Sequence, residues 1–495
     1  MKNCGALKKG QKPTWLDVRG NHDTFNTNGP KNDFYAKFGI EKDKRTYWKK
    51  IEARNTTVGL VALDATLMPG PKRPFNFFGS LDQTELSFFQ ATMEESVAKT
   101  DYQITFGHYP TSTILSPNPG VKSIMSRSLA YLCGHLHTLN GLVPHMYSSQ
   151  PQGFLELELG DWKDNRVFRV LALDQGQLVF KDGHYEDGME SFSIITNPMD
   201  MTFVQPEDFH LIRSSTHLRA LIFTSKRIAK AEMIIDDAHT FVLASENRPL
   251  FVAEWNSTIF QDNQIHTAKI IINYHDGTVE SQPEIRFSVA FDQDLGMTNA
   301  LAKIVLTFNW SLVTQAVFGM CAAFIVMPLC LLRSYPRWLT CSRWRTLRGL
   351  NDLAITNRFF YPVVMASLYI SFGPWAFGFI LDDHVGLLFP WGLFVDGHIL
   401  PADVTHLYGV FFMYPYLVML IFGISLRRPR RAFENWALYW LKANVIFFIV
   451  MTLQLLHCIE FYLCYGLLAT CLGICGVGRI LFVYHMWINS VSQKS

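Results

Sequence analysis

"YQITFGHYP" (Tyr102–Pro110) joins an apolar, strand-like run to a glycine and a histidine. Glycine lets the backbone turn sharply as it leaves a strand. The next side chain then projects over the carboxyl edge of the sheet, where ligands of α/β sheets collect. The stretch therefore predicts that His108 lies at the edge of an α/β sheet as a candidate ligand.

Two further turns have the same character. GNHD (Gly20–Asp23) follows the strand-like run Trp15–Arg19, and GHLH (Gly134–His137) follows another apolar run. His135 and His137 are two residues apart, so in an extended segment both side chains face the same side. Imidazole and amide oxygen are ligands that zinc, manganese and iron accept. Each motif alone is equally typical of an ordinary turn, but the three together predict a divalent-metal site.

The order GNHD, GHYP and GHLH resembles the calcineurin-like metallophosphoesterases, and ELELGDWKDNRVFRVLALD (Glu156–Asp174) adds to the likeness. The resemblance extends over essentially the whole chain, because a β-rich segment and C-terminal spans are similar to membrane-anchored members of that family. It implies a layered α/β sandwich that hydrolyses phosphate esters with two divalent metal ions, which could be Mn, Zn or Fe.

The resemblance also implies a role for each residue of the three turns. Asn21, His108 and His135 would bind one metal ion, and His137 would bind the other. His22 would steady the phosphoryl oxygen or the leaving group, and Asp23 would orient His22.

Two motifs that the family carries upstream of GNHD, Asp-x-His and Gly-Asp, have no counterpart before Gly20, where Asp17 is the only acid. A two-metal phosphoesterase holds its ions about 4 Å apart, and a bridging carboxylate offsets part of their repulsion. The remaining set of Asn21, His108 and His135 is neutral, so we expect at most one weakly bound ion. We expect little or no phosphoesterase activity in the chain as written, which would be a shorter isoform, a partial gene model or a pseudo-enzyme.

Residues 191–298 alternate short apolar strands with turns such as Asp276-Gly277, a strong hairpin signal. The pattern is typical of an immunoglobulin-like or fibronectin-like β-sandwich, with Trp255 as a core aromatic. No catalytic group of residues is visible there, so we expect a structural spacer or a protein-binding module. The chain is thus divided into a partial metallophosphoesterase domain (1–190), a β-sandwich (191–298) and a transmembrane domain of about five helices (304–488).

Long apolar runs begin near Ile304, and at least four of them reach the roughly 20 residues needed to cross a bilayer. A shorter run at Gly386–Val395 is expected to lie at the interface or to re-enter the membrane. The sequence therefore predicts a multi-pass membrane protein, in contact with lipid. The expected spans are Thr307–Leu332, Phe359–Leu381, Val404–Leu426, Ala437–Cys458 and Tyr462–Met486.

Charge orients these spans. The connections after the first and third spans are rich in arginine, whereas the loop between the second and third is acidic. Basic loops favour the cytoplasm, so the soluble N-terminal region is expected in the lumen or outside the cell and the C-terminus in the cytoplasm. Acceptor sequons at Asn55 and Asn256 agree with glycosylation on that side. The formal net charge of +2 argues against a nucleic-acid partner.

Two alternatives to a phosphoesterase stay open. In a non-catalytic receptor or scaffold, the β-sandwich would bind a protein partner. In a transporter, His457 and Glu460 would matter, because residues three apart share a helix face and ionisable groups in spans are functional candidates. Neither alternative nor the main interpretation identifies the phosphate-ester substrate.

Overall fold

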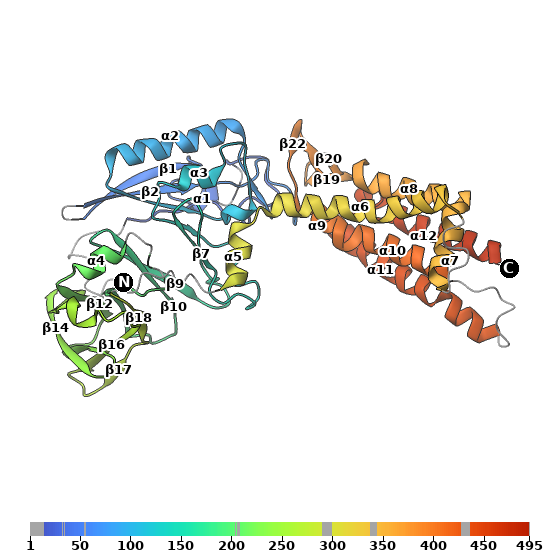
Figure 1. Cartoon of the computed structure of the whole chain (residues 1–495). Helices are drawn as coiled ribbons and strands as arrows, with labels where there is room; N and C mark the ends of the chain where they lie inside the picture. Colours follow the sequence, from blue (N-terminus) through green and yellow to red (C-terminus); the bar gives the residue numbers. More distant parts are fainter. Residues whose placement is uncertain are drawn as a thin grey trace.

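The computed structural model describes residues 14–31, 33, 35–53, 56–202, 204, 208–289, 299–336, 344–426 and 436–494. Figure 1 shows three parts: an α/β part, a β-rich part beside it, and an elongated group of helices that extends away from the α/β part. The three parts therefore follow one another along the chain in the order that the sequence predicts: α/β, then β-rich, then apolar helices.

A six-stranded sheet in the order β1-β2-β4-β6-β8-β7 forms the centre of the α/β part. The four inner strands are parallel, and β1 and β7 pair antiparallel at the two edges. The carboxyl ends of the parallel strands therefore meet at one edge of the sheet. The strands are β1 (Tyr47–Ala53), β2 (Thr56–Leu63), β4 (Tyr102–Gly107), β6 (Ala130–Cys133), β7 (Tyr147–Ser149) and β8 (Leu155–Glu158).

Helix α2 (Gln83–Lys99) covers one face of this sheet. Asp82 caps it in a reciprocal capping box with Glu85, and the helix buries Phe89 against a cluster that includes Val61. On the other face, the hairpin β9 (Val167–Asp174) and β10 (Gln177–His184) packs its apolar side chains against β4, β6 and β8. Shorter elements complete the part: α1 (Tyr35–Phe38), β3 (Gly79–Ser80), η1 (Thr111–Thr113), β5 (Ile114–Leu115) and α3 (Val121–Met125).

The strand expected at Trp15–Arg19 does not form. These residues are extended but pair with no other strand in the described ranges. Side chains hold the segment instead: the hydroxyl of Tyr35 donates to the Asp17 carboxylate at 2.6 Å, and the hydroxyl of Tyr47 donates to the Asp17 carbonyl at 2.6 Å. The periodicity of the segment is strand-like, but ladder partners decide whether an extended segment becomes a strand.

Arg19 links the entrance of the GNHD turn to the sheet. Its buried guanidinium lies 2.6 Å from the Asp33 carboxylate and 3.5 Å from the Asp64 carboxylate at the end of β2. It also donates to the carbonyls of Pro30 and Lys42. A buried charge is stable only when it is paired and hydrogen-bonded. Within the described ranges, Arg19 has three hydrogen-bond acceptors, while its Nη1 is held only by the ion pair with Asp64.

The β-rich part is a set of eight hydrogen-bonded strands around one apolar core. Strand β16 alternates buried and half-buried side chains along its length, as a strand with one face on a core does. Trp255 lies in that core and donates from Nε1 to the Ser215 hydroxyl at 3.1 Å. The elements are β11 (Ser191–Asn197), α4 (Phe209–Arg213), β12 (His217–Thr224), β13 (Ile228–Ile235), β14 (His239–Asn247), β15 (Leu250–Glu254), η3 (Ser257–Phe260), β16 (His266–Tyr274), β17 (Val279–Ser281) and β18 (Ile285–Phe287).

Among the described residues, three helical segments are long and apolar enough to cross a membrane: Trp310–Ser334, Val404–Leu426 and Asn444–Cys471. A pair of helices bent by 89° would make a fourth if it counts as one span. The protein is thus a membrane protein, with three or four candidate spans among the described residues where the sequence predicts about five. The helices are α5 (Ala300–Thr307), α6 (Trp310–Ser334), α7 (Arg345–Ile355), α8 (Asn357–Phe372), α9 (Val404–Tyr408), the π-helical turn η4 (Gly409–Met413), α10 (Tyr414–Leu426), α11 (Trp436–Cys471) and α12 (Val477–Lys494).

The expected spans differ from these helices at two places. The span predicted at Phe359–Leu381 ends at Phe372, because Gly373 and Pro374 follow and that pair ends helices. The spans predicted at Ala437–Cys458 and Tyr462–Met486 also differ, because α11 runs from Trp436 to Cys471 with a kink at Gly466, whose φ is 77° and ψ is −175°, and the next helix begins at Val477. Apolar content alone therefore located the membrane part but not its helix ends.

A four-stranded antiparallel sheet occupies the expected interfacial segment. Figure 1 shows it at the end of the helices that faces the α/β part. It packs on α11, where Ala469 leaves no room for a side chain at Gly378. The strands are β19 (Ala376–Leu381), β20 (His384–Phe389), β21 (Gly392–Val395) and β22 (His398–Leu400).

Replacing Arg19 by methionine is expected to destabilise the α/β part by about 3–5 kcal/mol, because the buried Asp33 loses its arginine and the buried Asp64 is left with Arg45. Hydrogen exchange of the β2 and β4 amides measures this change. Arg166→Met is the matched control, because Arg166 pairs with Asp187 at the surface and such pairs contribute only about 0–1 kcal/mol. Equal protection of the amides in both variants would show that the network around Arg19 is dispensable.

Candidate metal centre

The three histidine-bearing turns meet at the carboxyl edge of the six-stranded sheet. The Asn21 Oδ1 atom lies 2.9 Å from His108 Nε2, which lies 3.1 Å from His135 Nδ1. Gly20 makes this approach possible, because a Cβ there would lie 3.0 Å from His108 Nδ1. The structure therefore brings together one amide oxygen and two imidazoles from three separate turns.

Burial keeps both imidazoles neutral. Burial lowers the pKa of His108 to about 3, with a further contribution from His135. Burial also lowers the pKa of His135 to about 4. Neutral imidazole is the form that binds metal ions. The Nε2 atom of His135 is buried and has no hydrogen-bond partner among the described residues, which is typical of a group with an unfilled role.

His22 lies beside an arginine. Its Nδ1 atom is 3.0 Å from Nη2 of Arg73, and an arginine can only donate. Nδ1 therefore accepts, which places the proton of the neutral ring on Nε2. Burial and Arg73 lower the pKa of His22, so the neutral ring is favoured.

Asp23 and His137 occupy the edges of this group. The Asp23 carboxylate accepts from the Gly20 amide at 2.8 Å and, among the described residues, makes no hydrogen bond to His22, so its implied orienting role stays a prediction. His137 has a left-handed backbone, with φ of 54°. It lies close enough to His22, His108 and His135 to lower the pKa of each.

Two glutamates of β8 hold two of the turns, and the sequence interpretation gave them no role. The Glu156 carboxylate accepts from the amide and the hydroxyl of Thr111, just after GHYP, at 2.7 and 2.6 Å. Glu158 accepts from the amides of Leu136 and His137 within GHLH. The two glutamates are two apart and so share one side of the strand. The available signal was their alternation with leucine in LELE, since acids in a buried strand require partners.

The donor set fits one ion better than two. In the described ranges, no group of three or more His, Cys, Asp or Glu side chains is placed to hold a metal ion. Asp64, at the same sheet edge, is already engaged by Arg19, Arg45 and Thr66. Asn21, His108 and His135 could supply three neutral ligands to a borderline divalent ion, but nothing described could bridge it to a second.

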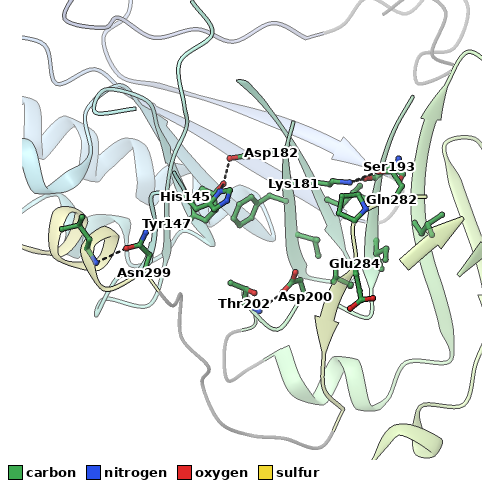
Figure 2. A pocket seen from close by; sticks show the side chains of 18 of the residues that line it. His145, Tyr147, Lys181, Asp182, Ser193, Asp200, Thr202, Gln282, Glu284 and Asn299 are labelled. Atoms are coloured by element: carbon green, nitrogen blue, oxygen red, sulfur yellow. Dashed lines mark hydrogen bonds between the residues drawn. The ribbon is translucent and has the colours of Figure 1, made fainter. Parts of the chain in front are cut away.

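A larger cavity lies away from these turns. It has a volume of 820 Å³ and separates the hairpin β9–β10 from the β-rich part and from the start of α5. Figure 2 shows Lys181 reaching across it, where its ammonium donates to the Ser193 carbonyl at 2.8 Å and to Gln282 Oε1 at 3.0 Å. Lys181 thus joins the hairpin to the β-rich part across this cavity.

Comparison with known proteins identifies relatives that cover most of this chain. Transmembrane protein 62 of Mus musculus is 31% identical over 478 residues, which cover 93% of this chain and 73% of the mouse protein. The chain belongs to the transmembrane protein 62 family. The model of the TMEM62 Ig-like domain matches residues 187–292, which correspond to the β-rich part.

This chain is also similar to phosphoesterases. A candidate metallophosphoesterase of Arabidopsis thaliana is 23% identical over 462 residues, 75% of this chain and 61% of the plant protein. Tartrate-resistant acid phosphatase type 5 of Sus scrofa is 26% identical over 230 residues, 42% of this chain and 65% of the phosphatase. No solved structure matches the chain. The resemblance to metallophosphoesterases seen in the sequence is thereby confirmed.

Glu158 gives the stability of this site a pH dependence. Burial raises its pKa from 4.5 to about 8. When a carboxyl group has a higher pKa in the folded state than in the unfolded state, the folded protein loses stability as pH rises from the unfolded pKa to the folded one. The α/β part is therefore expected to become less stable between about pH 4.5 and pH 8.

Glu158→Gln keeps the acceptor and removes the charge, so its stability should fall less between pH 5 and pH 8 than that of the parent. Glu158→Ala leaves two amides without an acceptor and should lose about 1–3 kcal/mol throughout. Thermal unfolding across this pH range measures both effects, with the exposed Glu186→Gln as control. A Glu158→Gln curve parallel to that of the parent would exclude this titration.

Proposed function

We propose that the protein is a membrane-anchored, metallophosphoesterase-like hydrolase of phosphate esters whose reaction site is the sheet edge where the three turns meet. The observation that supports this proposal is the convergence of Asn21, His108 and His135 within hydrogen-bond distance. The chain spans 73% and 61% of its mouse and plant relatives, so the activity of a whole family member is part of the proposal.

In this proposal Asn21, His108 and His135 hold one divalent ion, and His137 faces a second position. Such an ion, when bound, supplies Lewis acidity toward the phosphate and toward an attacking water. Zn and Fe suit the two imidazole donors and Mn suits the amide oxygen, so the donor set does not choose among the three metals.

The residues around His22 bind and orient the ester. Arg73 fixes the His22 proton on Nε2, so that this N–H points a donor at a phosphoryl or leaving oxygen. Hydrolysis forms one bond from a water oxygen to phosphorus and breaks the ester P–O bond, and the leaving oxygen takes up a proton. Asn76 donates to the Asn21 carbonyl at 2.8 Å and thereby keeps the GNHD turn in place.

We also propose that hydrolysis is slow or absent in the chain as given. The described donors are neutral, and two dications close together repel strongly unless an anionic ligand bridges them. Acidic ligands from Asp-x-His and Gly-Asp motifs would provide that bridge.

The same proposal places the reaction site in the lumen or outside the cell. Arg333 and Arg348 lie on α6 and α7, on the arginine-rich connection, and the acidic hairpin β19–β20 lies by the α/β part. This distribution supports a cytoplasmic side opposite the α/β part. The Asn256 sequon is exposed in the β-rich part and is proposed to carry a glycan, whereas Asn55 lies outside the described residues.

The proposal is tested with two proteins: the chain itself, and an extended form with Asp-x-His and Gly-Asp motifs in front of Trp15. Bound Mn²⁺ and Zn²⁺ are measured with hydrolysis of bis(4-nitrophenyl) phosphate. The chain should bind at most one ion, and the extended form should bind more and turn over the ester.

In the extended form His108→Ala should reduce kcat/KM by at least about 100-fold. Removing a residue that only supports a metal ligand costs up to about 100-fold, and removing a ligand itself should cost no less. His210→Ala is the control, because His210 is exposed in the β-rich part. An extended form that binds no metal and hydrolyses nothing would reject the enzyme in favour of a scaffold.

A further inference from the structure

The segment Arg73–Phe75 contacts the candidate metal centre on one side and the membrane helices on the other. The guanidinium of Arg73 reaches His22, 3.0 Å away. The carbonyl of the same residue accepts a hydrogen bond from the Tyr465 hydroxyl of α11. Phe75 packs its ring 5.5 Å from the Tyr465 ring and is buried within the apolar core of the helices.

Neighbouring residues attach the same turns to the hairpin β19–β20. The Lys72 ammonium lies 2.7 Å from the Asp382 carboxylate, and the Lys72 amide donates to the Ile380 carbonyl at 3.2 Å. After the GNHD turn, Asn28 Nδ2 lies 3.2 Å from His384 Nε2. The metal centre is therefore built directly against the membrane part, without an intervening linker.

A small cavity of 140 Å³ opens beside this segment. Its walls are mostly apolar and include Phe75, Trp375, Leu388 and Phe461. Cys464 also lines it and is exposed on α11, within the segment able to cross the membrane. Complete small-molecule pockets have roughly 300–1,000 Å³, so this cavity suits part of an apolar chain that enters from the bilayer.

The groups next to the cavity suit a phosphate. Arg73 is exposed, and its guanidinium also stacks on the Phe25 ring at 4.4 Å. Lys163 is a second cation close enough to His22 to affect its titration. Arginine forks match phosphate oxygens. The Cα atoms of Arg73 and Phe75 are at most about 7 Å apart, so a phosphate and the start of an attached chain can contact both.

We propose that the substrate is the phosphate ester of a membrane-resident amphiphile, with its phosphate at His22 and Arg73 and its apolar chain in the cavity beside Phe75. This inference rests on the proposed function, because it names the substrate class of the same site. It also accounts for the attachment of the metal centre to the membrane part: a substrate that stays in the bilayer can be reached only by a site fixed at its surface.

The test needs no catalysis. The full chain is placed in phosphatidylcholine vesicles and irradiated with a hexadecyl phosphate that carries a diazirine in its chain, and the labelled residues are mapped by mass spectrometry. Label is expected on residues 461–465 of α11 or on Pro74 and Phe75. Unlabelled hexadecyl phosphate should suppress it, whereas ethyl phosphate, which has the same head without the chain, should not.

Two cysteine variants of α11 form a matched pair. Cys464→Trp fills the cavity from an exposed position and should reduce the label about tenfold, the effect of losing roughly two buried methylene groups. Cys471 is also exposed on α11 but does not line the cavity, so Cys471→Trp should leave the label unchanged. Arg73→Gln should reduce labelling by the phosphate probe but not by the corresponding diazirine alcohol.

Label distributed evenly over the lipid-facing helices, or equal label in the two tryptophan variants, would overturn the inference. A second measurement distinguishes this failure from a failure of the proposed function. It compares the kcat/KM of the extended form for 4-nitrophenyl hexadecyl phosphate with its kcat/KM for 4-nitrophenyl ethyl phosphate. Equal hydrolysis of both esters without cavity labelling would retain the hydrolase and reject the lipid substrate. Cavity labelling without hydrolysis of either ester would reject the hydrolase and retain a binding site for a phosphate amphiphile.

Discussion

The parallel register of β4, β6 and β8 is the constraint on which the rest of the structure depends. It brings the ends of three strands to one edge, where each chain segment leaves as a turn. Glu156 and Glu158 then fix two of these turns from the last of the three strands. The histidines consequently need no direct contact with a cofactor to be placed side by side. A sheet edge and two buried carboxylates are sufficient to position them.

Much of this arrangement could be predicted from local patterns, and its failures have identifiable causes. Glycine–histidine pairs after apolar runs correctly indicated turns at the sheet edge, because a strand end and a sharp turn are both local properties. Trp15–Arg19 has the same local pattern but lacks a pairing partner among the described residues, and pairing is a non-local property. The helix expected to reach Leu381 ends at Phe372, because Gly373 and Pro374 follow it. The prediction missed this end because it gave more weight to the apolar residues on both sides of the Gly-Pro pair.

The side chains that support the candidate site were harder to predict. Glu158 stands in a strand of leucines, and nothing nearby in the sequence shows that its partners are amides in GHLH. Arg73 lies 51 residues from His22 in a loop without a recognisable motif. Contacts of this kind depend on which loops the fold places together, so a single amino-acid sequence contains little trace of them. The role of each turn residue as a metal ligand remains a prediction.

The burial of Phe75 among the membrane helices has a consequence for how the protein can exist. A protease that cut between the β-rich part and α5 would leave the α/β part attached to the membrane helices, because Phe75 would stay buried among them and Lys72 would keep its ion pair with Asp382. Cleavage of the chain at that point would therefore not by itself free the soluble parts from the membrane.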